Sequence, residues 1–415
     1  MSDLAWLHAA LISARPQAMS ALLRHFRDIE LAEEAFQEAS LRALRHWPEK
    51  GPPRDAAAWL IFVGRNAAVD LLRRTRRETA LPPEEALSET GDAEAETVER
   101  LDGAAYRDDI LRLMFICCHP DLPATQQVAL ALRIVSGLSV AEIARAFLVG
   151  ESAMEQRITR AKARIGQGGI GFETPGAIER AERLGAVAAM LYLLFNEGYT
   201  AGSAMASARA ALSEEAIRLT RLLVRLFPAE PEILALLALM LLQQSRLRAR
   251  FDAQGQAVSL EDQDRSLWDR AAIDEALALV DKALRHQRPG PYQIQAAIAA
   301  LHARAERAEA TDWAGIAQLY AALERMQPSP VVTLNRAVAV AKLEGPEAGL
   351  ALIEPLAGRL SGYFYFHGAR GAFLGQCGRA AEAREAFNRA IALAGSAAEA
   401  ADIRRHIDRL DRPAS

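Results

Sequence analysis

One pattern runs through this chain from end to end: apolar residues recur every three to four positions, as they do along one face of an α-helix. Stretches in which β-branched or aromatic residues alternate with polar ones, as in a half-buried strand, are absent. Alanine, leucine, arginine and glutamate, which all favour helices, dominate the sequence. The sequence therefore predicts an all-α protein in which amphipathic helices cover one another's apolar faces.

The length and composition indicate a folded protein of several domains. The chain has 415 residues, enough for two or three domains, and 51% of them are hydrophobic. The longest apolar runs, Ala186–Phe195 and Ile233–Leu242, are shorter than the ~20 residues that span a bilayer. The N-terminus lacks the basic start of a signal peptide, and three cysteines are too few for a disulfide framework. We expect a cytoplasmic protein that makes no membrane contact.

Two polar stretches divide the helical pattern. Residues 78–105 hold nine acidic side chains and one basic one, a net charge of −8, which is the composition of a flexible linker. Glycines mark a second boundary at Gly166–Gly176. These features predict an acidic linker at 78–105 and helical domains at 1–77, 106–165, 177–290 and 291–410.

The segment Trp59–Arg77 is apolar at its start and basic at its end. Four arginines fall within its last five positions, where they suit both DNA phosphates and the helix dipole. A solvated helix end explains this cluster equally well. A break at Pro48–Pro53 separates it from a helix ending near Trp47, whose apolar positions include Leu41 and Leu44. The outer face of that earlier helix mixes acids and bases, Glu33 among them, and suits either a protein partner or solvent.

The segment Leu138–Arg164 is typical of a helix-turn-helix. Ser139 and Glu142 form a capping box before the first helix, and Gly150 in the turn can adopt a left-handed conformation. Ser152 is a candidate cap for the second helix, which runs to about Ile165. We expect four apolar residues of this helix to face inward: Met154, Ile158, Ala161 and Ile165. The alternative is an unrelated helical hairpin.

In a helix-turn-helix the N-terminal part of the second helix enters the major groove. Glu151, Ser152, Glu155 and Gln156 are therefore candidate base readers, because carboxylates accept from cytosine and glutamine pairs with adenine. The basic residues of the same helix are better placed for phosphates: Arg157, Arg160, Lys162 and Arg164.

The C-terminal part of the chain repeats with a period of about 34 residues. Small residues recur at Ala303, Ala337 and Gly371 and again at Gly315, Gly349 and Ala383, and large apolar ones recur at Leu319, Ile353 and Phe387. This period is that of tetratricopeptide repeats, in which small residues let paired helices approach closely. Generic helical hairpins are the alternative.

Two other groups of residues carry weaker signals. Cys117 and Cys118 are adjacent and have no second ligand pair, so we interpret them as buried apolar residues and expect no metal and no cofactor. The polar and aromatic stretches at 195–199 and 261–270 suit either a binding surface or the capping and pinning of neighbouring helices.

Three segments within residues 1–165 resemble the extracytoplasmic-function (ECF) sigma factors of bacterial RNA polymerase: AEEAFQEASLRALRHW, WLIFVGRNAAVDLLRRTRR and LSVAEIARAFLVGESAMEQRITRAKARI. The rest of the chain, with YLLFNEGY, LEDQDRSLWDR and the repeats, is similar to the ECF subgroup that has a large C-terminal helical extension. The resemblance implies a sigma-2 domain at 1–77, a sigma-4 helix-turn-helix domain at 106–165 and a tetratricopeptide-like regulatory extension.

The resemblance also implies a non-enzyme with two partners, core RNA polymerase and promoter DNA. It places polymerase contacts at Glu34, Gln37, Glu38 and Arg42. It places contacts with the melted −10 element at Trp59, Asn66, Asp70, Arg73, Arg74, Arg76 and Arg77, beside the loop Pro48–Arg54. The duplex −35 element would meet the helix-turn-helix residues named above, and the repeats would take a further protein partner.

Two other functions fit part of the pattern. One is a conventional helix-turn-helix regulator with a repeat-based sensor, which would have no use for the motifs in Leu31–Arg77. The other is a repeat scaffold whose basic helices are merely solvated.

Overall fold

In the computed structural model, every named element of the described residues is a helix, which confirms the all-α prediction. The description covers residues 5–51, 53–77, 113–119, 121–147, 149–167, 177–199, 206–252, 256–394 and 397–410. The predicted acidic linker lies outside these ranges. The chain forms two compact units, Met1–Leu194 and Phe195–Ser415, whose boundary falls within α9 (Ala177–Tyr199).

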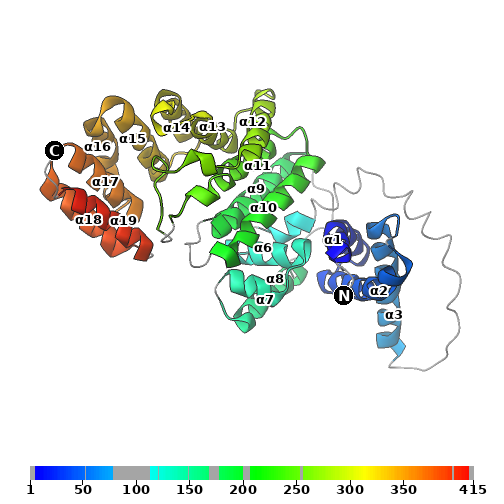
Figure 1. Ribbon diagram of the computed structural model, residues 1–415. Coiled ribbons are helices and arrows are strands. Elements are labelled where there is room, and N and C mark those ends of the chain that lie inside the picture. Colours follow the sequence, from blue (N-terminus) through cyan, green and yellow to red (C-terminus); the bar gives the residue numbers. More distant parts are fainter. Residues whose placement is uncertain are drawn as a thin grey trace. The chain divides into compact units, whose positions relative to one another are not determined.

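The first unit begins with three helices that pack on one another: α1 (Ala5–Phe26), α2 (Ile29–Lys50) and α3 (Ala56–Arg77) (Figure 1). Asp28 and Asp55 fix the starts of α2 and α3, because each carboxylate accepts two backbone N–H groups of the first turn. At Gly64 a side chain would meet the Ala35 carbonyl at 3.0 Å, so α3 and α2 approach closely there.

The end of α2 corrects the prediction of a loop from Pro48 to Arg54. The helix continues to Lys50 and stops at Gly51, whose φ of +82° no helix can continue and whose N–H donates to the Trp47 carbonyl. A proline is tolerated in this last turn because its missing N–H breaks only one bond of the helix. The loop before α3 is therefore shorter than expected.

The second part of this unit contains α6 (Ala124–Ala131), the π-helix η1 (Leu132–Ser136), α7 (Val140–Ala146) and α8 (Glu151–Gln167). Gly137 ends η1 in the left-handed region at φ +78°. Cys117 and Cys118 are buried here, as predicted, and burial raises the pKa of Cys118 to about 12.

The second unit is a series of helices that contact their neighbours in sequence (Figure 1). It contains α10 (Ala206–Leu226), α11 (Pro231–Gln244), α12 (Arg270–Leu284), α13 (Pro291–Arg304), α14 (Trp313–Met326), α15 (Pro330–Glu344), α16 (Pro346–Ile353), α17 (Phe364–Gln376), α18 (Ala380–Leu393) and α19 (Ala397–Leu410). Short 3₁₀ turns interrupt the connections at Leu247–Ala249, Arg265–Leu267, Ala308–Ala310 and Glu354–Leu356. Among the described residues, no helix has the length and apolar character that crossing a bilayer requires.

The predicted 34-residue period coincides with the helix pairs. The helices α14, α16 and α18 begin at Trp313, Pro346 and Ala380, spacings of 33 and 34 residues. A side chain at Gly371 of α17 would lie 2.6 Å from the ring of Phe387 on α18. In this copy of the period, the small residue and the large one therefore meet across the α17–α18 pair.

The two polar stretches, 195–199 and 261–270, contain residues that hold neighbouring helices in place. Asp269 caps α12 through the backbone N–H of Ala272. Arg265 donates to the carbonyl of His302 in the last turn of α13 and to that of Ala305 just after the helix. The Arg250 guanidinium lies 3.9 Å from the centre of the Tyr199 ring.

Candidate nucleic-acid interface

The predicted capping box before α7 is confirmed. The backbone N–H of Ser139 donates to Glu142 at 2.8 Å, and the N–H of Glu142 donates to the Ser139 hydroxyl at 3.2 Å. The four predicted inward residues of α8, Met154, Ile158, Ala161 and Ile165, are all buried. The helices α7 and α8 thus form one compact hairpin. The side of α8 that does not carry these four residues lies at the surface.

The turn before α8 differs from its prediction in two details. Gly150 does not adopt a left-handed conformation; in this domain it is Gly137, before α7, that does. Since α8 begins at Glu151 and the Met154 N–H donates to the Gly150 carbonyl, Ser152 lies in the first turn and is not the cap. Neither difference moves the start of α8 away from the turn.

The candidate base readers on α8, Glu151, Ser152, Glu155 and Gln156, are all exposed. Among the candidate phosphate contacts, Arg160 and Arg164 are exposed and Arg157 is half-buried. Lys162 differs, because its side chain is only 16% exposed and its Nζ lies 2.6 Å from Glu33 Oε2. In this structure the Lys162 ammonium is therefore paired with a protein carboxylate.

The residues predicted to contact the −10 element lie along α3. Trp59 is half-buried and meets Trp47 edge to face at 5.3 Å between ring centres, while Asn66 is exposed. The helix continues to Arg77. The side chains of Asp70, Arg73, Arg74, Arg76 and Arg77 lie outside the described residues, so their predicted roles stay predictions.

The outer face of α2 combines charged and apolar side chains. Glu34 and Gln37 are exposed, and Arg42 pairs at 3.0 Å with Glu38, both partly exposed. Leu41 and Leu44, which the helical pattern predicted only as apolar positions, are 51% and 47% exposed. Helical spacing places these leucines on the same face as Glu34, Gln37 and Glu38.

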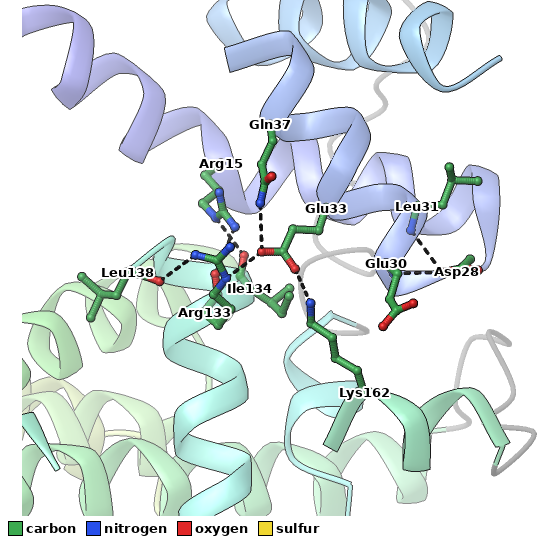
Figure 2. Close-up of polar contacts among 10 residues, drawn as sticks. All are labelled: Arg15, Asp28, Glu30, Leu31, Glu33, Gln37, Arg133, Ile134, Leu138 and Lys162. Carbon is green, nitrogen blue, oxygen red and sulfur yellow. Dashed lines mark hydrogen bonds and ion pairs between the residues drawn. The ribbon is translucent and has the colours of Figure 1, made fainter. Parts of the chain in front are cut away.

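A cluster of residues from both parts of the unit was not predicted from the sequence. Glu33 was expected on the outer face of α2, yet it is buried, with its side chain 3% exposed. Figure 2 shows its carboxylate between Arg133 of η1 and Lys162 of α8, with Oε1 2.7 Å from Arg133 Nε. We call Arg15, Glu33, Arg133 and Lys162 the interdomain cluster.

Arg15 of α1 makes the second attachment in the interdomain cluster. Its Nε donates to the Ile134 carbonyl and its Nη2 to the Arg133 carbonyl, both at 3.0 Å, and its guanidinium lies 4.6 Å from the centre of the Phe36 ring. Burial lowers the pKa of Arg15 to about 10, and the charge of Glu33 opposes this shift. No local pattern indicates these partners, since they lie more than a hundred residues away in the sequence.

Comparison with protein families assigns three parts of the chain. Sigma-70 region 2 matches residues 11–78, and Sigma-70 region 4 matches residues 112–165. A family of unknown function (DUF6596) matches residues 183–284. No solved structure matches the chain.

Two curated proteins illustrate these relationships. Over 410 residues the chain is 70% identical to an uncharacterized protein of Rhizobium meliloti (strain 1021), a match that covers 99% of this chain and 97% of that protein. Over 143 residues it is 33% identical to the ECF RNA polymerase sigma factor BldN of Streptomyces coelicolor; this match covers 32% of the chain and 50% of that protein.

A region-2 helical domain followed by a region-4 helix-turn-helix domain defines a sigma factor of the sigma-70 class. Within that class, the chain belongs to the ECF RNA polymerase sigma factors and carries a large C-terminal helical extension.

Proposed function

We propose that this protein binds core RNA polymerase through the outer face of α2 and directs it to promoters that it reads at two elements. The observation that carries the proposal is the N-terminal half of α8, where Glu151, Ser152, Glu155 and Gln156 are all exposed. In a helix-turn-helix this is the part that meets base edges in the major groove. The chain makes and breaks no bond in this role.

The second element would be read along α3. Trp59 offers an aromatic face beside Trp47, and Asn66 lies two turns further along the helix. Unstacked bases gain ~1–3 kcal/mol each from stacking on such aromatics, which supports capture of a melted −10 strand. We infer that the arginines ending at Arg77 neutralise adjacent phosphates.

The polymerase contact would rest on Leu41 and Leu44 together with Glu34, Gln37, Glu38 and Arg42. Two exposed leucines amid charged residues on one helix face resemble the centre and rim of a protein interface. The cytoplasm, where polymerase acts, is the corresponding location.

Retention of core polymerase tests this proposal. Immobilised full-length protein should retain purified core polymerase and support run-off transcription from a cognate promoter. Replacing Leu41 and Leu44 with serine should abolish retention, whereas the same change at Leu284 and Leu343, which are 54% and 47% exposed, should not. If wild-type protein binds duplex promoter but never core polymerase, it is a conventional regulator and the sigma proposal fails.

We further propose that the C-terminal extension is tetratricopeptide-like and binds a protein partner that controls transcription. The helix pairs repeat every 33–34 residues, and a cavity of about 690 Å³ among α15, α17, α18 and α19 offers both charges, including Lys342, Arg405 and Asp402. Removal of the residues after 170 should change run-off transcription. Unchanged transcription, with and without the host lysate, would exclude a regulatory role.

A further inference from the structure

A second, smaller cavity of the extension lies against the polar stretch 261–270, for which the sequence left a binding surface open. Its volume is about 240 Å³. This is far more than the ~30 Å³ of one water molecule and slightly less than the ~300–1,000 Å³ of pockets that hold drug-sized ligands. The cavity therefore suits a small organic molecule. Its polar and aromatic lining residues are Arg265, His302, Thr311, Trp313, Tyr320 and Asn335.

Arg265 brings a buried positive charge to this cavity. The residue is 7% exposed, and its Nη1 donates at 2.6 Å to the carbonyls of His302 and Ala305. No carboxylate of the described residues pairs with it, since Glu309 acts on it only through its charge. Its Nε is buried and has no hydrogen-bond partner in that part of the chain. Because a buried charge is costly unless it is paired, this guanidinium lacks a compensating anion.

Thr311 adds a second unpaired group to the same cavity. It is 7% exposed, and its buried Oγ1 has no hydrogen-bond partner among the described residues. Most buried polar atoms in proteins are paired, and an exception calls for a reason such as an ion or a functional role. A water molecule could pair with Thr311, but it could not neutralise Arg265. The two residues together therefore favour an anion.

The other charges near the cavity leave that of Arg265 uncompensated. Burial and the charges of Arg246 and Arg265 lower the pKa of His302 to about 4, so its ring is neutral near pH 7. Among the described residues that line the cavity, Glu261 is the only acid, and it pairs at 2.8 Å with Lys342. A ligand with a single negative charge would balance the site.

The rest of the lining is apolar and aromatic. Trp313 and Tyr320 come from α14, together with Ile316, and the Trp313 ring meets His302 edge to face at 5.3 Å between ring centres. Aromatic faces of this kind favour contact with another flat ring. A carboxylate matches the planar fork of a guanidinium. The lining therefore fits a molecule with a carboxylate at one end and a flat apolar body at the other.

We propose that this cavity binds a small carboxylate with a flat apolar body, which Arg265 and Thr311 hold at its charged end and Trp313 contacts at the other. The cavity shares Ser259, Glu261 and Val338 with the wider one of about 690 Å³. A bound carboxylate thus lies beside the site proposed for a protein partner. Its effect on transcription rests on that proposed function, whereas the binding itself does not.

Fluorine NMR of the full-length protein, labelled with fluorotryptophan, follows the cavity through Trp313. The variant Trp313→Phe assigns its resonance, and benzoate is the probe, because it joins a carboxylate to a flat ring. We expect a saturable shift with a dissociation constant on the order of 1 mM, and binding weaker by about tenfold or more for neutral benzamide. Trp47 and Trp59 of the first unit should not shift. Equal binding of the two probes, or no saturable shift, would overturn the proposal.

The variant Thr311→Val removes the hydroxyl and keeps the shape of the side chain. Because this hydroxyl has no partner among the described residues, the melting temperature should not fall, yet benzoate should bind about tenfold more weakly. Thr220→Val is the matched control, since it makes the same change at a fully buried threonine of α10 whose hydroxyl bonds to the Ala216 carbonyl. It should leave benzoate binding unchanged. Wild-type affinity in Thr311→Val would contradict the proposed contact.

Arg265→Gln removes the charge and should abolish the preference for benzoate over benzamide. If its lost bonds to the end of α13 prevent folding, the two probes and Thr311→Val still decide the question. Run-off transcription with and without benzoate then separates the site from its consequence. Saturable binding with unchanged transcription would support the site and count against the regulatory role proposed for the extension.

Discussion

At the scale of single residues, the extension depends on positions where a methyl group has no room. Gly371 is such a position, since an added Cβ would lie 2.6 Å from Cδ1 and Cε1 of Phe387. Alanine favours helices over glycine by about 1 kcal/mol, but overpacking of a filled core costs roughly 1–3 kcal/mol. We therefore expect Gly371→Ala to lower the free energy of unfolding of the extension.

Urea unfolding, combined with hydrogen exchange of α17 and α18, measures this loss. Gly358→Ala is the control, because no atom lies within 4 Å of its added Cβ. It should stay within ~0.5 kcal/mol of wild type. Equal stability of the two variants would show that Gly371 and Phe387 do not meet closely, and with that the repeat packing would lose its support.

At the scale of elements, we predict that α8 has separable roles along its length. Arg160 and Arg164 are exposed in its C-terminal half, where they suit phosphates and not bases. Replacing both with alanine should weaken binding to every −35 duplex alike and lower the salt slope of the affinity by about two, one for each phosphate contact. Fluorescence anisotropy over a salt series measures the slope.

The matched control for this pair replaces Arg389 and Arg404, exposed arginines of α18 and α19. Neither the control nor the α8 pair should change retention of core polymerase. A loss that is confined to one base position would instead assign the α8 arginines to base reading.

The elements also show which features a sequence can predict. Met154, Ile158, Ala161 and Ile165 were predicted to be buried because helical spacing alone decides which residues share a face. The same spacing could not separate core leucines from the exposed Leu41 and Leu44, since an exposed apolar face and a core face show the same sequence pattern. Glu33 was misplaced for a different reason: its partner Lys162 is 129 residues away, and only the folded chain brings the charges together.

At the scale of the whole molecule, we expect the reach of the chain between the sigma domains to limit promoter reading. Deletion of residues 84–101 would leave 17 of the 35 residues from 78 to 112, which can span at most about 60 Å. Two domains that read separate promoter elements at once must be able to stand apart, and the shortened connection limits how far they can do so. We expect the shortened protein to retain core polymerase but to lose the −35 contribution, an affinity loss of about tenfold or more, since each good base contact is worth ~1–3 kcal/mol.

The control for this deletion replaces residues 84–101 with glycine and serine at equal length, which keeps the reach and removes seven acids and one base. Run-off transcription from a promoter with both elements should fall for the deletion and persist for the replacement if reach is what matters. A fall in both variants would assign the role to the acidic charge of the segment, through its attraction to basic polymerase surfaces. Full activity of the deletion would mean that the two domains need not stand so far apart, and the predicted role of the reach would be wrong.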